Sequence, residues 1–186
     1  MQELELNKGE QLFAGSGWGL FATDDKDLAI MQWEDKCAGR LAWDIHHMLK
    51  GHALSTNCVQ RFGASGIVVK QLEMLAVTLR VQTTPTDTQI TLLGEQGTEL
   101  ERKEAEQLPH VKPTRLATME DVALHTARCL RAHLAPMGFA ELDLRLQFGL
   151  AAGGETLLSV PNPLECSFGT EEYEALCERL GHKDGV

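Results

Sequence analysis

Residues 77–83 alternate between apolar and polar side chains over most of their length, and this alternation constrains the fold strongly. In an extended strand Leu79 and Val81 lie on one face, and Arg80 and Gln82 lie on the opposite face. A strand with one apolar face stabilises a protein only when that face is buried. The segment therefore predicts a sheet that packs against a core on one side.

Short β-prone runs separated by turn residues predict further strands. Residues 19–23 and 28–33 flank an Asp-Asp-Lys-Asp turn and predict a hairpin. Residues 141–150 and 155–160 flank Ala-Ala-Gly-Gly and predict a second hairpin. Two more strands are expected at residues 67–69 and 89–93.

Three segments have the apolar spacing of helices. Leu41, Ile45 and Leu49 predict a short helix that stops at the Lys-Gly pair after Leu49. Residues 118–135 predict a longer helix, opened by a capping box and carrying one apolar stripe. A last helix is expected after residue 170, ending at a glycine. Strands and helices together predict an α+β fold.

The polar, charged segment of residues 94–113 reads as a connector near a lobe boundary. We expect residues 1–83 to form a small sheet lobe with a glycine-rich loop. Residues 84–186 would form a second lobe with helices and a hairpin. A chain of 186 residues is short enough for both lobes to unfold as one cooperative unit.

Composition and charge disfavour several classes of partner. The net charge of -10 opposes broad contact with nucleic acid or anionic lipid, so neither is expected as a partner. No apolar run approaches a membrane span, and the first residues lack the features of a signal peptide, which predicts a cytoplasmic protein. The five cysteines are scattered without a C-x-x-C pair, and we expect them to be reduced thiols in or near the core.

Two segments resemble a known enzyme family. Residues 69–77 read VKQLEMLAV, similar to V-K-K-L-E-M-x-P-V, and residues 142–150 read LDLRLQFGL, similar to V-D-F-K-L-E-F-G-L. Both patterns belong to SAICAR synthetase, which joins aspartate to a carboxylated aminoimidazole ribotide with ATP and magnesium. The glycine-rich opening hairpin, residues 15–33, is weakly similar to that of the family. The resemblance implies two lobes of antiparallel sheets with flanking helices around a nucleotide cleft.

The resemblance also implies candidate site residues. Those expected at a nucleotide are Gly15, Gly17, Lys70, Glu73 and Met74. Those expected at another ligand are Arg80, Asp143, Arg145 and Gln147. It further implies that residues 67–72 and 141–150 meet at a common cleft.

Several positions depart from the family pattern, and they are the charged ones. The family's two loop lysines, its phosphate-binding arginine, its magnesium-binding glutamate and its Asp-Glu pair are replaced, respectively, by Ser16, Trp18, Gln82, Gln147, Val160 and Pro161. Each missing electrostatic partner costs about 3 to 4 kcal/mol of transition-state stabilisation. No catalytic residue is therefore assigned.

Three functions remain open from the sequence. The leading hypothesis is a diverged protein that binds a purine nucleotide or related small molecule without the full ligase reaction. The second is an active ligase in which Arg80 and Arg145 replace the missing cations, and only this function requires ATP and Mg²⁺. The third is a module that binds or inhibits a protein partner through its acidic surface.

Other clusters have simpler interpretations. His125, Cys129 and His133 share one helix flank, where packing is a better explanation than a metal site. The pair His46 and His47 is expected on a solvated helix face. The three tryptophans are expected in the core or between the lobes. Asp143 and Arg145, two positions apart on a strand, predict either a salt bridge or a ligand role.

Overall fold

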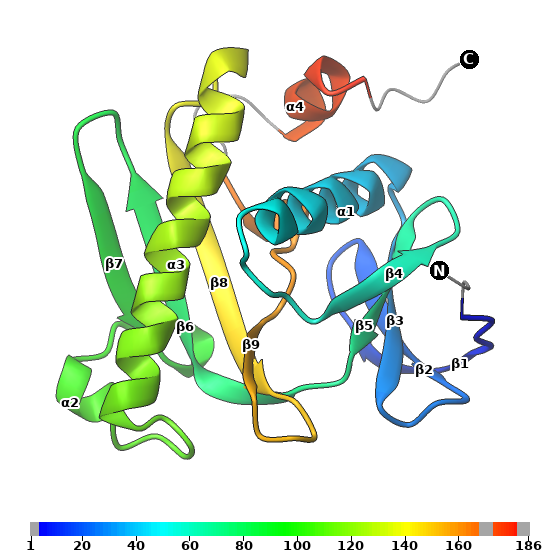
Figure 1. Ribbon diagram of the computed structural model, residues 1–186, viewed down its shortest axis with the longest axis horizontal. Helices are drawn as coiled ribbons and strands as arrows, with labels where there is room; N and C mark the ends of the chain where they lie inside the picture. The colour runs from blue at the N-terminus through cyan, green and yellow to red at the C-terminus, as the bar shows by residue number, and fades with distance from the viewer. Residues whose placement is uncertain (1–3, 168–172, 182–186) are drawn as a thin grey trace.

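Two antiparallel sheets, each covered by one long helix, form the molecule (Figure 1). The computed structural model describes residues 4–167 and 173–181. The α+β class and the antiparallel sheets expected from the sequence are confirmed. None of the helices in these described residues is long and apolar enough to cross a membrane.

The first sheet has the strand order β1-β2-β3-β5-β4. The bounds of these strands are β1 Lys8–Ala14, β2 Trp18–Thr23, β3 Leu28–Trp33, β4 Cys58–Phe62 and β5 Gly66–Lys70. β2 and β3 pair antiparallel from Trp18–Trp33 to Ala22–Ala29, which confirms the first predicted hairpin. This sheet and the helix that covers it form the first half of the molecule, and the second sheet with its helix forms the second half. Ala29, Ile67 and Val69 are buried in the core of the first half.

Helix α1, Lys36–Gly51, covers the first sheet and ends where the sequence predicts. Its amino end is capped by Asp35, whose Oδ1 accepts a hydrogen bond from the backbone amide of Cys37 (2.7 Å). Beyond the carboxyl end, the amide of Leu54 donates to Leu49 O (3.0 Å) and that of Ala53 donates to Lys50 O (3.1 Å). These two bonds form a Schellman motif, with Ala53 in the left-handed conformation (φ 59°).

The second sheet has the strand order β7-β6-β8-β9. Its strands are β6 Glu73–Thr83, β7 Thr88–Leu93, β8 Leu142–Leu150 and β9 Thr156–Leu158. The predicted alternation is confirmed, because Leu79 and Val81 are fully buried beside Leu144 and Leu146 of β8. The second predicted hairpin is also present, since β8 pairs antiparallel with β9.

Helix α3, Pro113–Leu134, packs on the apolar face of this sheet. The predicted start at Thr118 is wrong, because Pro113 begins the helix and Thr118 Oγ1 donates to Thr114 O inside it (3.0 Å). Proline at the first helical position is favoured because the missing amide would have no partner there. The chain leaves α3 through a 3₁₀ turn, Ala135–Met137, and Gly138 (φ 98°).

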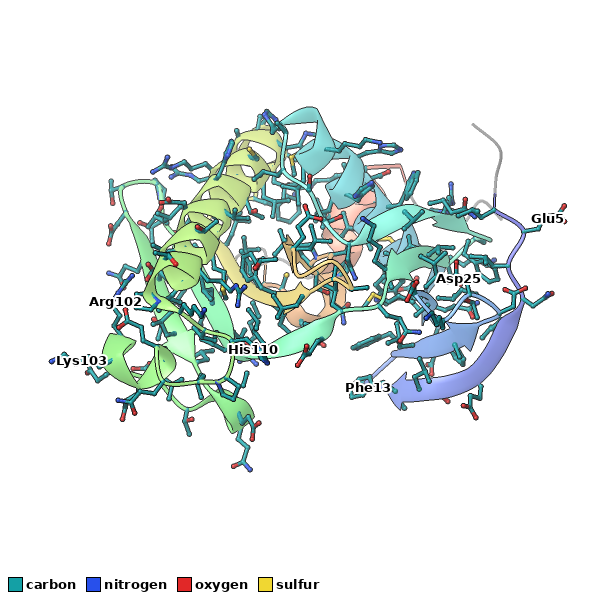
Figure 2. The ribbon with its side chains drawn as sticks, turned by 60° about the horizontal axis from the view of Figure 1, so that its bottom comes forward. Glu5, Phe13, Asp25, Arg102, Lys103 and His110 are labelled. Atoms are coloured by element: carbon teal, nitrogen blue, oxygen red, sulfur yellow. A yellow bond between two sulfur atoms is a disulfide. The ribbon has the colours of Figure 1, made fainter. Side chains whose placement is uncertain are left out.

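The connector between β7 and α3 is more structured than its polarity suggests. It contains a 3₁₀ turn, Glu95–Gly97, and a short helix α2, Arg102–Ala105, whose amino end is capped by a capping box. Figure 2 shows Arg102 and Lys103 at the outer edge of the second half, far from Phe13 on β1. Ala105 and Val111 are buried, so the connector is anchored to the core.

The two halves are in contact at several places, including the packing of α1 against α3. The link between β5 and β6 crosses the end of β8, where a Cβ on Gly149 would lie 2.6 Å from the Cβ of Leu72. On the other side the amide of Asn57 donates to Leu158 O (3.0 Å) and the amide of Val160 donates to Asn57 Oδ1 (3.0 Å). The sheets divide between Lys70 and Glu73, whereas we expected the lobe boundary after residue 83, because β6 pairs on both sides within the second sheet.

A disulfide joins Cys37 of α1 to Cys177 of α4, Tyr173–Arg179. The prediction of reduced thiols is wrong for this pair, since residues 140 positions apart give no spacing signal. Cys58 and Cys129 are free and buried, and Cys166 is free and half-buried. Disulfides are rare in the reducing cytosol, so the cytoplasmic location stays a prediction.

Ala53→Gly tests the Schellman motif. The left-handed conformation destabilises an alanine by about 1 kcal/mol but not a glycine. We therefore expect the free energy of unfolding to rise by about that amount. Ala117→Gly, on the exposed face of α3, is the matched control and should lower it by about 1 kcal/mol. Urea denaturation measures both, and destabilisation by both substitutions would contradict the motif.

Thr126→Val tests a buried hydroxyl in α3. Thr126 is fully buried, and none of the residues that the structure describes forms a hydrogen bond with its Oγ1. Valine keeps the shape and removes the unsatisfied group, so we expect stability to rise by about 1 kcal/mol in urea denaturation. Thr126→Ser keeps the hydroxyl, removes a methyl group and should be destabilising. A loss of stability in the valine variant would reveal a partner for the hydroxyl.

Candidate functional site

A cavity of about 530 Å³ lies on the face of the second sheet that α3 does not cover. Its floor comes from β6 and β8, and its walls come from the loop after β7 and from the 3₁₀ turn Pro163–Glu165. The lining residues are Leu75, Ala76, Thr78, Leu93, Gly94, Glu95, Gln96, Gly97, Arg145, Gln147 and Glu165.

The register of β6 and β8 places the polar floor. Thr78 lies opposite Gln147, and Arg80 lies opposite Arg145. Residues directly opposite each other in an antiparallel pair share a face of the sheet. The burial of Leu144 and Leu146 against α3 therefore turns Arg145 and Gln147 toward the cavity.

Arg80 and Asp143 are bound to each other. Arg80 Nε donates to both carboxylate oxygens of Asp143 (2.9 and 3.1 Å), and Nη2 donates to Oδ2 (2.5 Å). Gln82 Nε2 also donates to Asp143 Oδ2 (3.2 Å). Hydrogen bonding to Asp143, and then its charge, raise the pKa of Arg80. Of the two roles left open for Asp143 and Arg145, the salt bridge between them is not the one formed by Asp143, because its partner Arg80 comes from the neighbouring strand.

Arg145 is the cation that remains open to a ligand on this floor. Within the described residues, no hydrogen bond or ion pair engages its side chain. It lines both the main cavity and a narrow crevice of about 20 Å³ beside it. A guanidinium can hold a carboxylate or phosphate through two parallel hydrogen bonds.

Trp18 fills the space beside the glycine-rich turn. The indole packs so closely that a Cβ on Gly15 would lie 2.2 Å from Trp18 Nε1. The amide of Gly15 donates to Trp18 O (2.9 Å), and Gly17 adopts a left-handed conformation (φ 74°) to close the turn. Trp18 lines the crevice together with Arg145. Neither glycine lines the main cavity, and the Gly15 amide is already used.

The other three residues expected at the nucleotide, Lys70, Glu73 and Met74, lie at the junction of the halves. Lys70 ends β5, and Glu73 and Met74 begin β6, all exposed. The carboxylate of Glu73 lies 3.5 Å from His110 Nε2. Leu75 is the first residue of β6 that lines the cavity, so these three side chains lie beside the cavity but do not line it.

Of the predicted site residues, Arg145 and Gln147 are the two that line the cavity. Sequence reasoning missed the turn at residues 94–97 and Glu165. Gly94 and Gly97 around Glu95 and Gln96 were the available signal for the turn. Glu165 had none, because its place depends on contacts with distant residues.

A hydrogen-bonded chain holds Glu165 at the rim. Trp33 Nε1 donates to Asn162 Oδ1 (2.9 Å), and Asn162 Nδ2 donates to Glu165 Oε1 (3.1 Å). Trp33 and Asn162 are both buried, so the chain is anchored in the core as expected for Trp33. It fixes a carboxylate at the cavity that also contains the Arg145 guanidinium.

The described residues provide no magnesium site made of protein side chains alone. No three His, Cys, Asp or Glu side chains among residues 4–167 and 173–181 are placed to share a metal ion. Asp143 is engaged by Arg80, which leaves Glu95 and Glu165 as the acidic residues on the lining. Magnesium in nucleotide sites needs carboxylate oxygens that are free to coordinate it.

The two groups of histidines predicted from the sequence differ in burial. His125 and His133 are exposed and Cys129 is buried, so they do not converge. The solvated helix face expected for His46 is wrong, because its side chain is 6% exposed. His46 Nδ1 lies 2.7 Å from Thr56 Oγ1, which the fold brings against α1.

The whole structure is similar to solved SAICAR synthetases. A Type-2 SAICAR synthetase in complex with ADP matches with a TM-score of 0.81 at 16% identity, covering 95% of this chain and 100% of that one. The enzyme from Ehrlichia chaffeensis matches at 0.80 and 11%, covering 95% and 100%. That from Pyrococcus horikoshii OT3 matches at 0.75 and 14%, covering 98% and 100%. The sequence matches no protein-family model and no curated protein. This chain has the fold of the SAICAR synthetases.

Proposed function

We propose that this protein binds a purine-type small molecule in the cleft and does not carry out the full ligase reaction. The observation that supports this proposal is a cavity of about 530 Å³ in a SAICAR synthetase fold, lined by Arg145, whose side chain is engaged by no described residue. Small-molecule sites commonly have volumes of this order. A neighbour of the same fold was solved with ADP, which supports a ligand of this class.

The charges of the lining favour a ligand with few negative charges. Arg145 faces the cavity together with Glu95 and Glu165, so one cation is offset by two carboxylates. A triphosphate tail would meet repulsion from both acids unless metal ions screened it. The Trp18 indole occupies the space beside the glycine-rich turn, which further disfavours phosphates there.

The active-ligase alternative is weakened by the state of Arg80. That alternative requires both Arg80 and Arg145 as replacement cations. Arg80 is held by Asp143 through three contacts of 2.5 to 3.1 Å, and moving it to a substrate would leave that carboxylate unpaired. Phosphoryl transfer depends almost entirely on positioning and charge stabilisation, so one open cation supports binding better than turnover.

Thermal unfolding with adenosine, AMP and ATP tests the ligand. We expect AMP to raise the Tm at least as much as ATP, with the gain preserved in EDTA, because Arg145 can pair with one anionic group without a metal. Arg145→Gln should weaken AMP binding about tenfold or more while leaving adenosine binding nearly unchanged. Arg128→Gln, an exposed arginine on α3, is the matched control and should leave both unchanged.

Two outcomes would contradict the binding proposal. One is stabilisation by ATP with magnesium that exceeds stabilisation by AMP and disappears in EDTA, which would favour the ligase. The other is the absence of any purine effect in calorimetry together with capture of one macromolecular partner through acidic surface residues. That result would favour the interaction module.

A ligase assay tests the missing chemistry. Purified protein supplied with ATP, magnesium, aspartate and the carboxylated aminoimidazole ribotide should form no succinocarboxamide product, because the lost partners together remove most of the transition-state stabilisation. Product formation that disappears in Arg145→Gln would overturn this prediction. Trace product that survives in that variant identifies a host enzyme in the preparation.

A further inference from the structure

A second cavity, of about 370 Å³, lies between the carboxyl end of α1 and the edge strand β4, apart from the cleft residues. In Figure 1, α1 lies next to β4, above it in this view. The cavity is lined by His46, Lys50, Ala53, Leu54, Ser55, Thr56, Cys58 and Val59. None of these residues also lines the cleft cavity or its crevice.

The hydrogen bonds of Thr56 fix the orientation of the His46 ring. Thr56 Oγ1 accepts a hydrogen bond from the amide of Cys58 (3.2 Å) and lies 2.7 Å from His46 Nδ1. The Thr56 hydroxyl proton is satisfied when it is donated to His46 Nδ1. Since the described residues give this proton no other acceptor, we infer that Nδ1 accepts it and that the ring proton of neutral His46 is on Nε2.

The Nε2–H group of His46 is available to the cavity. No hydrogen bond among the described residues engages Nε2, and it is not among their buried atoms without a partner. Burial, and then the charges of His47 and Lys50, lower the pKa of His46 to about 4. The ring is therefore neutral near pH 7 and offers one donor.

The charges around the cavity differ from those of the rest of the chain. The protein carries a net charge of -10, yet none of the described lining residues is acidic and Lys50 supplies a positive charge. The carboxyl end of α1 opposes this effect, but two hydrogen bonds reduce its negative potential. The carbonyl groups of Leu49 and Lys50, which would repel an anion, accept hydrogen bonds from the amides of Leu54 and Ala53.

We propose that this cavity is a second binding site, for a small anion with a carboxylate or phosphate group held by the Lys50 ammonium and His46 Nε2–H. A charge-assisted hydrogen bond from Lys50 supplies the stronger contact, and the fixed imidazole supplies direction. Leu54 and Val59 on the same lining leave room for a short carbon chain beside the anionic group. The site is independent of the function proposed for the cleft.

Carbon-detected histidine NMR of the whole chain tests the site. We titrate succinate, inorganic phosphate and the neutral analogue succinamide at constant ionic strength and follow the His46 ring signals. Succinate or phosphate should shift these signals saturably with a Kd of about millimolar order, and succinamide should not. The stronger of the two anions identifies the recognised group, and the exposed His125 on α3, which does not line this cavity, is an internal reference.

Lys50→Gln should weaken the anion affinity about tenfold or more. Lys36→Gln, also exposed but at the opposite end of α1, should leave the affinity unchanged and is the matched control. Both side chains are on the surface, so both variants should fold. The absence of a saturable His46 shift with either anion would overturn the proposal. So would a shift that succinamide reproduces or that Lys50→Gln leaves unchanged.

Discussion

The antiparallel pairing of β6 with β8 is the constraint on which the cleft depends. Strand side chains alternate with a period of two, so the burial of Leu79 and Leu144 under α3 also decides what the opposite face presents. A shift of one residue in this register would bury arginines and expose leucines. Because that exchange would be strongly destabilising, the core under α3 fixes which polar residues form the floor of the cleft.

The charges on that floor decide which groups the cleft presents to a ligand. Arg80 and Asp143 neutralise each other across neighbouring strands, with Gln82 as a third partner. The two side chains are 33% and 28% exposed, so the pair contributes modestly to stability, but a ligand must compete with it for either group. The remaining cation, Arg145, faces two carboxylates rather than the cationic cluster that a triphosphate requires.

The segment around Thr56 and Asn57 connects the two cavities physically. The Thr56 hydroxyl contacts His46 in the second cavity, and its backbone forms a parallel bridge with Leu158 of the second sheet. Asn57 accepts a hydrogen bond from the amide of Val160, which lines the crevice beside Arg145. Buried polar groups in this segment are satisfied by contacts between the halves, so it joins the sheets rather than acting as a loose loop.

The sequence by itself determined the local features: the alternation in β6, the hairpin of β2 and β3, the end of α1 at Gly51, and two motifs that pointed to the fold. Those signals depend on neighbouring residues, which propensity and periodicity report directly. The tertiary structure decided which side chains meet. Arg80 forms an ion pair with Asp143, Cys37 forms a disulfide with Cys177, and His46 is buried. Each of these features depends on residues that are distant along the chain. Spacing within a segment carries no record of such partners, which are set only when the sheets and helices pack.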